Sequence, residues 1–161
     1  MRENDFIVSK TDLAGRITYG NRIFIEYSGY SEKELLGTQH NIIRHPDMPR
    51  AAFKLVWDLI KAKQEFFGFV KNMTSDGSFY WVFTHITPSY DRNGNVVGYL
   101  SVRRKPNTSV LPTVEGLYKQ MLMIEKREGP KQAVEASTKF LLDFLAQKKV
   151  SYEELVLSLQ G

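Results

Sequence analysis

The sequence predicts an α+β fold, a five-stranded antiparallel sheet with short helices on one face and a C-terminal helical extension, from three observations. The strand-like segments form two groups, two near the N-terminus and three in the middle of the chain. Strong turn signals separate strands, such as the Asn93-Gly94 pair that favours a hairpin. Beyond residue 112 the composition changes to helix formers. Such a fold leaves a cavity between sheet and helices, where ligands commonly bind.

The first two strands are predicted at Phe6–Val8 and Arg16–Tyr19. The segment Asp12–Gly15 between them has an aspartate that can bond its own backbone and a glycine that accepts a positive φ. These segments together indicate a hairpin.

Short helices are predicted after this hairpin. Asn21 is placed to cap the first helix, and Gly29 follows its end. Ser31 and Glu34 have the spacing of a capping box, in which each side chain accepts a hydrogen bond from the backbone N–H of the other residue. Gly37 stands where a glycine commonly follows the end of a helix.

The segment 38–49 is predicted to be irregular, because Pro46 and Pro49 oppose a regular helix. A longer helix is expected from Arg50 onward. Its apolar residues repeat with a 3.6-residue period at Phe53, Val56, Trp57 and Ile60. This face of the helix is therefore expected to be buried.

Three further strands are predicted at Phe66–Met73, Phe79–Thr87 and Val96–Arg104. The segment Ser75–Gly77 is a turn, and Pro88 is expected to end the second of these strands. Strand alternation places Tyr80, Val82 and Thr84 on one face and Trp81, Phe83 and His85 on the other, and leaves open which face is inward.

The remainder of the chain is predicted to be a helical extension. Apolar residues repeat at helical spacing at Val114, Leu117, Tyr118 and Met121, and again at Val134, Phe140, Leu141, Phe144 and Leu145. Ser151 and Glu154 open a third helix with another capping box. We therefore expect a domain over residues 1–105, a linker over 106–112 and the extension over 113–161.

The composition excludes several classes of function. The absence of cysteine excludes disulfides, thiolate metal sites, iron–sulfur clusters and cysteine nucleophiles, and it fits a reducing, cytoplasmic location. No segment approaches the roughly 20 apolar residues of a membrane span, so direct membrane insertion is not expected. The net charge of +4 is a mild excess, with its densest basic run at residues 103–105, and does not predict a nucleic-acid partner.

Several stretches resemble the PAS superfamily, and more narrowly its aerotaxis-receptor branch. Two stretches typical of PAS domains in general lie at residues 12–21 and 28–37. The stretch specific to the branch is His40-Asn41-Ile42-Ile43-Arg44-His45-Pro46-Asp47-Met48-Pro49. Further matches lie at 68–72, 79–82 and 98–103, so that the resemblance covers about residues 5–105.

The resemblance implies a PAS fold and a non-catalytic sensor of redox or energy state. Domains of this branch typically hold FAD in their cavity and read its redox state. The implied partner is a chemotaxis-type transducer or a histidine kinase signalling protein, and we expect a homodimer. The helices of the extension would fold over the sheet, pair across a dimer or dock on a separate transducer.

The resemblance and the chemistry of the side chains together predict a cofactor site. Its predicted residues are Asn41, Arg44, His45, Asp47, Trp57, Phe66, Asn72, Trp81, His85 and Arg103. Arg44 could make charge-assisted hydrogen bonds to a pyrophosphate or to ring carbonyls, His45 could bond the ring, and Asp47 could orient His45. The alternative is that this loop is ordered by its own hydrogen bonds.

The other predicted residues lie on regular elements. Flavin-binding members often have tryptophan where this chain has Phe66, and phenylalanine stacks with less area and no N–H donor. Asn72 could bond the edge of a flavin ring with both atoms of its amide, and Arg103 is expected on a strand that faces the cavity. Trp57 fits either the cavity wall or the core.

A haem site and two other functions are weighed against this interpretation. A histidine beside aromatic residues, such as His85, is compatible with haem, for which His40 and His45 are the other candidates. No metal site or catalytic motif is predicted, and we expect no enzyme activity. A cofactor-free PAS module for dimerisation or docking is the first alternative function, and an enzyme with a bound flavin is the second.

Overall fold

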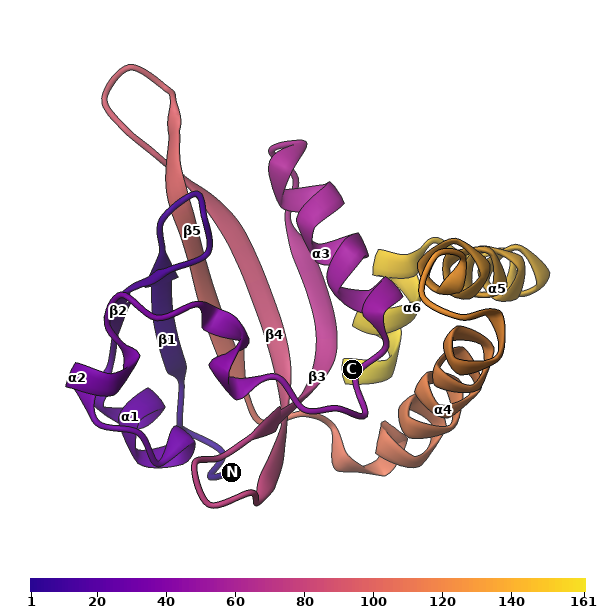
Figure 1. Cartoon of the computed structure of the whole chain (residues 1–161), viewed down its shortest axis with the longest axis horizontal. Coiled ribbons are helices and arrows are strands. Elements are labelled where there is room, and N and C mark those ends of the chain that lie inside the picture. The colour runs from indigo at the N-terminus through magenta and orange to yellow at the C-terminus, as the bar shows by residue number, and fades with distance from the viewer.

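The computed structural model describes all residues 1–161, in which two strands, a group of helices and three further strands precede a helical end (Figure 1). In chain order they are β1 (Ile7–Thr11), β2 (Ile17–Gly20), α1 (Arg22–Ser28), α2 (Glu32–Leu35), η1 (His40–Ile43, a 3₁₀ helix), α3 (Arg50–Lys61), β3 (Phe66–Met73), β4 (Phe79–Tyr90), β5 (Val96–Arg104), η2 (Thr108–Val110, a 3₁₀ helix), α4 (Leu111–Glu128), α5 (Ala133–Lys148) and α6 (Tyr152–Gln160).

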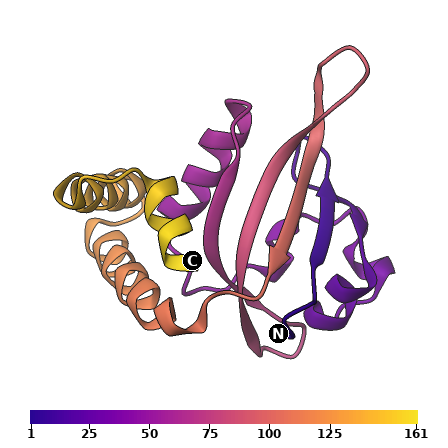
Figure 2. The same cartoon turned by 180° about the vertical axis from the view of Figure 1, so that it is seen from behind.

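The five strands form one antiparallel sheet in the order β2-β1-β5-β4-β3. Helices α1 to α3 lie on one side of it, and α4 to α6 lie beyond β3 (Figure 1). Seen from behind, β1, β5 and β4 have no helix in front of them (Figure 2). The predicted fold class is therefore confirmed, including the short helices on one face and the helical extension.

Local capping residues begin the short helices as predicted. The Asn21 side chain accepts a hydrogen bond from the N–H of Phe24 and so caps α1. Ser31 and Glu34 form the capping box of α2, and Ser151 forms the corresponding box at the start of α6. These side chains satisfy backbone N–H groups that have no partner within the helix.

The first two strands are shifted from their predicted bounds, with β1 extending to Thr11 rather than Val8. Two further predicted boundaries are wrong, and both involve proline. β4 continues through Pro88 to Tyr90, because β3 pairs with β4 only as far as Ile86 and leaves an open edge beyond it, where proline is tolerated. α4 begins at Leu111 rather than after Pro112. Proline fits the first turn of a helix because its missing N–H would be unpaired there.

The sheet has two different faces, and the alternation in β4 is now resolved. Val82 is fully buried against the N-terminal elements, and Thr84 lies on the same face, toward α3. Phe83 lies on the other face and joins the core formed with the extension. Trp81 and His85 share that outer face by alternation.

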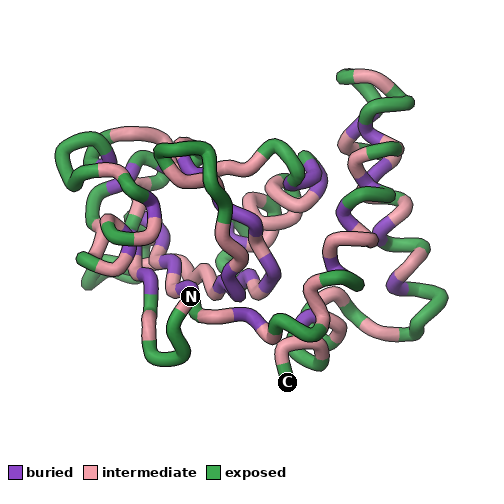
Figure 3. Tube along the Cα trace, turned by 90° about the horizontal axis from the view of Figure 1, so that it is seen from below, coloured by how far each residue is buried: buried purple, intermediate pink, exposed green.

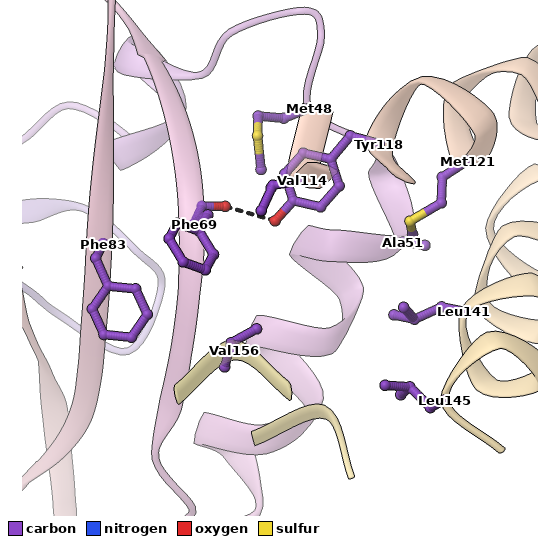
Figure 4. Packing of buried hydrophobic residues seen from close by; sticks show 10 residues of the cluster. All are labelled: Met48, Ala51, Phe69, Phe83, Val114, Tyr118, Met121, Leu141, Leu145 and Val156. Atoms are coloured by element: carbon purple, nitrogen blue, oxygen red, sulfur yellow. Dashed lines mark hydrogen bonds between the residues drawn. The ribbon is translucent and has the colours of Figure 1, made fainter. Parts of the chain in front are cut away.

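The extension shares a hydrophobic core with the sheet and α3 (Figure 4). Buried residues recur at helical spacing along α4 and α5, as the colours along the chain show (Figure 3). The core residues are Met48, Ala51, Phe69, Phe83, Val114, Tyr118, Met121, Leu141, Leu145 and Val156. The apolar faces predicted from the sequence of the extension are thus covered within the same chain.

The outer edge of β3 is covered by side chains and by a backbone bridge. The Tyr118 hydroxyl donates to the carbonyl of Phe69 at 2.6 Å, and the Lys71 N–H points to the sulfur of Met48 at 3.3 Å. Asn72 pairs with Arg44 as an isolated antiparallel bridge. These contacts leave little of the edge free to pair with another strand.

Glu125 of α4 caps the N-terminus of α3 from a distance of about seventy residues in sequence. Its carboxylate accepts from the N–H of Arg50 at 2.7 Å and lies 3.4 Å from the N–H of Ala51. Pro49, at the cap position itself, offers no side-chain hydrogen bond. A buried carboxylate at a helix N-terminus also interacts favourably with the helix dipole.

The two ends of the extension are joined by hydrogen bonds. The Asn107 side chain donates to the carbonyl of Leu159 at 3.0 Å, and its backbone N–H donates to the side chain of Gln160 at 2.9 Å. Gln160 in turn donates to the carbonyl of Lys105 at 3.3 Å. We call this set of contacts the terminal clamp.

Gly98 and Gly116 give a matched test of the fold. A Cβ on Gly98 would lie 2.2 Å from the backbone oxygen of Thr11, so Gly98→Ala must displace β1 or β5 and should lower the free energy of unfolding by about 1–3 kcal/mol. A Cβ on Gly116 in α4 meets nothing within 4 Å, so Gly116→Ala should raise it by about 0.5–1 kcal/mol. Urea unfolding measures both, and equal effects would contradict the predicted strand contact.

Candidate functional site

A cavity of about 260 Å³ lies between the sheet, η1 and α3. This volume is close to roughly 300 Å³, the lower end of the range that is usual for small-molecule sites. The lining residues are Thr11, Gly15, Gln39, His40, Asn41, Ile43, Arg44, Phe53, Val56, Trp57, Ile60, Phe66, Val70, Asn72, Thr84, Ile86, Tyr99, Ser101 and Arg103. Two arginines and no carboxylate are among them.

Aromatic side chains make up much of the apolar wall. Trp57 of α3 meets Tyr99 of β5 edge to face, with ring centroids 5.9 Å apart. Phe53 lies on the same helical face as Trp57, one turn earlier. Phe66 enters from β3. Flat rings of this kind suit a planar aromatic ligand.

Three buried polar atoms of the wall have no hydrogen-bond partner within the chain. They are the Nδ2 of Asn72, the Oγ1 of Thr84 and the Nε of Arg103, and the residues are only 3%, 3% and 2% exposed. A buried polar atom without a partner costs about 1–3 kcal/mol. A ligand with acceptor atoms would satisfy the two N–H donors.

Arg103 is held among neutral groups. Its Nη2 donates to the hydroxyl of Ser9 at 2.5 Å, its Nη1 lies 3.5 Å from the Nε2 of His40, and its guanidinium lies 4.7 Å from the ring centre of Phe24. Burial, and then the charge of Arg103, lower the pKa of His40 to about 3. Burial lowers the pKa of Arg103 to about 10, which leaves it charged at neutral pH.

Arg44 is the second guanidinium of the cavity. It lies over the ring of Phe53, 4.2 Å from the ring centre. Burial, followed by the charge of Arg50, lowers the pKa of Arg44, while Glu125 acts in the opposite direction. Asn41 precedes it on η1 and accepts the backbone N–H of Arg44 through its carbonyl. Arg44 therefore joins the cavity to the surroundings of Glu125.

The structure brings six of the ten predicted site residues together at the cavity. They are Asn41, Arg44, Trp57, Phe66, Asn72 and Arg103. Arg103 belongs to the basic run 103–105, yet its side chain lines the cavity from β5 and is buried. The other four predicted residues, His45, Asp47, Trp81 and His85, are not part of the lining.

His45, Asp47 and Trp81 instead gather around Lys71 on the other side of β3. Lys71 Nζ lies 2.8 Å from the Asp47 carboxylate and 6.0 Å from the ring centre of Trp81. The Asp47 N–H donates to Nδ1 of His45, and burial, followed by the charge of Lys71, lowers the pKa of His45. Arg44 pairs with β3 in extended geometry, so successive side chains point to opposite sides and His45 turns away from the cavity.

His85 lies on the outer face of β4. Its ring stacks on Phe67 with centroids 4.3 Å apart, and its Nε2 lies 3.1 Å from a carboxylate oxygen of Glu65. Of the three histidines considered for haem, only His40 lines the cavity. Its Nε2 is already engaged by the Ser9 hydroxyl at 2.9 Å. No group of three or more metal-ligating side chains comes together in the structure.

Sequence reasoning missed several lining residues. The polar ones are Thr11, Gln39, Thr84 and Ser101, together with His40, which was considered only as a haem ligand, and the aromatic ones are Phe53 and Tyr99. Thr84 could have been found from its alternation with Val82, once the inward face of β4 was known. His40 opens the branch-specific stretch, but nothing in its spacing indicates that it contacts an arginine more than sixty residues away.

Comparison with known proteins places residues 17–103 within the model of the PAS fold family. The chain is 39% identical to the aerotaxis receptor of Escherichia coli (strain K12) over 121 residues, which are 75% of this chain and 24% of the receptor. It is 30% identical to the nitrogen fixation regulatory protein of Klebsiella pneumoniae over 102 residues, or 63% of this chain and 21% of that protein. The chain thus spans less than a quarter of the length of these relatives.

Solved structures show the same fold at lower identity. The light-state structure of the blue-light photoreceptor Aureochrome1 LOV matches with a TM-score of 0.60 and 21% identity, over 71% of this chain and 91% of that one. A light-oxygen-voltage domain studied with a flavin analogue matches with the same TM-score and 23% identity, over 71% and 87%. No helix of the present chain has the length and apolarity needed to cross a bilayer.

The chain combines an antiparallel sheet with a ligand-sized cavity under short helices. Together with its relationship to these regulators, this architecture is that of a sensory domain of signal transduction. The chain belongs to the PAS fold family, and its PAS domain is of the aerotaxis-receptor type.

Proposed function

We propose that this chain is a cytoplasmic, non-catalytic redox sensor whose cavity binds a flavin, in the form of FAD, and whose C-terminal helices pass the signal on. The observation that carries the proposal is a set of buried polar atoms without partners, at Asn72, Thr84 and Arg103, beside an aromatic wall. A flavin ring has a flat aromatic body and an edge of carbonyl and ring-nitrogen atoms, so it matches both features.

Residues of this chain would hold the group in two ways. Trp57, Phe66 and Tyr99 would enclose the ring, and Asn72 and Arg103 would donate to its polar edge. Arg44 is less buried than Arg103 and would contact the charged tail. The flavin, when bound, supplies an electron-accepting ring whose charge and hydrogen-bonding pattern differ between its redox states.

One connection from the cavity to the extension passes through Phe66. Its ring lines the cavity and stacks on Tyr152 of α6, with centroids 6.0 Å apart and planes inclined by 21°. A Cβ on Gly68 would lie 2.5 Å from the hydroxyl of Tyr152, so α6 reaches the wall only because position 68 is glycine. A ligand that shifts Phe66 therefore displaces a residue of the extension.

A second connection passes through α3. This helix supplies Trp57 and Phe53 to the wall, and its N-terminus is bound by Glu125 of α4. A rigid shift of α3 upon a change in the ligand would alter these hydrogen bonds. A re-paired buried hydrogen bond of about 1–3 kcal/mol is sufficient to bias a two-state element.

The proposed partner of the extension is a chemotaxis-type transducer or a histidine kinase signalling protein, with the chain acting as a homodimer. The relationship to an aerotaxis receptor supports a taxis partner. Size-exclusion chromatography with light scattering, alone and with a candidate transducer, would test both parts. A monomer that binds no such protein would contradict them.

The experiment that tests the cofactor is an absorption spectrum of the purified chain, followed by mass spectrometry of whatever heating releases. A yellow protein that releases FAD supports the proposal. A colourless protein that still binds a partner would favour the cofactor-free dimerisation or docking module instead. Turnover of a reduced nicotinamide by the yellow protein would indicate an enzyme.

A further inference from the structure

Arg103 is a buried cation without a counter-charge. It is 2% exposed, and no carboxylate lies within 4 Å of its guanidinium. Removing such an ion from water is costly unless an opposite charge accompanies it. The other buried cation of this chain, Lys71, does have a partner in Asp47.

Every group that faces Arg103 is neutral. β1 contributes the Ser9 hydroxyl, α1 the ring of Phe24 and η1 the imidazole of His40. The phenol of Tyr80 on β4 is the acidic group whose charge would act on Arg103, but burial raises its pKa and keeps it protonated. The Nε of Arg103 remains without any hydrogen-bond partner.

The lining of the cavity as a whole also has positive charges without negative ones. Its lining contains two guanidiniums, those of Arg103 and Arg44, and no aspartate or glutamate. Arg44 likewise forms no ion pair within 4 Å, and its guanidinium lies on the ring of Phe53. The cavity is therefore positively charged, with its most buried charge at Arg103.

We infer that Arg103 selects the negatively charged form of the ligand, so that the occupant of the cavity supplies the missing counter-charge. This inference rests on the proposed flavin and adds to it a preference between redox states. An oxidised flavin ring is neutral, whereas a ring that has taken up two electrons and one proton carries one negative charge. The uncompensated guanidinium favours the second form, and neutral His40 adds no competing cation.

The test measures the affinity of the ligand-free chain for riboflavin, which lacks a phosphate tail, in its oxidised form and in its dithionite-reduced form under anaerobic conditions. We expect the wild-type chain to bind the reduced form at least tenfold more tightly. Arg103→Gln should weaken the binding of the reduced form at least tenfold more than that of the oxidised form, and so lose this preference. Arg103→Lys, which keeps a charge, should retain most of it.

Arg104 provides the matched control. It follows Arg103 on β5, points to the outer face over Phe83 and is exposed, so Arg104→Gln should behave as wild type. A second readout is the absorbance of bound reduced riboflavin against pH: its ring N–H should ionise at lower pH on the wild-type chain than on Arg103→Gln. An unchanged preference in Arg103→Gln overturns the inference, whereas a wild-type chain that binds neither form overturns the flavin proposal itself.

Discussion

Phe69→Ala should lower the free energy of unfolding by about 3–5 kcal/mol, because it empties the centre of the core shared by the sheet and the extension. Phe69 is 1% exposed, and its ring meets that of Phe83 with centroids 5.2 Å apart. Residues of α4, α5 and α6 belong to the same cluster (Figure 4). Urea unfolding followed by tryptophan fluorescence and by far-ultraviolet circular dichroism measures the loss.

Tryptophan fluorescence and circular dichroism together show whether the sheet and the extension unfold as one unit with a shared core or as two separate units. The tryptophans, Trp57 and Trp81, report on α3 and β4, whereas circular dichroism is dominated by the long helices of the extension. If the core is shared, both transitions should move to lower urea together in Phe69→Ala. Leu142→Ala on the exposed side of α5 is the control and should change stability by less than about 0.5 kcal/mol. A helical transition unaffected by Phe69→Ala would contradict a shared core.

Glu125→Ala should lower the free energy of unfolding by about 3 kcal/mol. The substitution removes a charged acceptor from the N–H groups of Arg50 and Ala51 and leaves the start of α3 without a cap. Hydrogen exchange of the amides of Arg50 and Ala51 should accelerate more than that of the C-terminal half of α3. Thermal and urea unfolding give the total loss.

Glu115→Ala is the matched control on the same helix. Glu115 makes only an exposed contact with Lys119 at 3.8 Å, and such ion pairs contribute little to stability. Its replacement should therefore change stability by at most about 0.5 kcal/mol. If both glutamate variants behaved alike, Glu125 would not anchor α3, and the connection between cavity and extension through this helix would be lost.

Much of the fold follows from local chemistry that one sequence displays. The bounds of β3 are those predicted, and the caps at Asn21, Ser31 and Ser151 bind the backbone groups expected of them. Hydrophobic periodicity identified the face of α3 that lines the cavity, although only Ile60 on it is buried and Phe53, Val56 and Trp57 are half-buried. Each of these features depends on residues within a few positions of one another, so spacing alone can reveal it.

The residues of the candidate site could be predicted only where the sequence also indicates to which side of the backbone the side chain points. Arg44 and His45 are adjacent in the branch-specific stretch, yet an extended backbone sends one into the cavity and the other toward Lys71. The inward face of β4 depends on which side α3 covers. His40 and Glu125 act on partners more than sixty residues away, and no local pattern encodes such contacts.

The terminal clamp holds the two ends of the helical extension together. Because Asn107 and Gln160 hold its beginning and its end side by side, the three helices form a closed ring rather than a trailing tail. A displacement at the end of β5 would enter this ring at two points at once, forward into α4 and across the clamp into α6. Opening the clamp would remove the second of these two entry points.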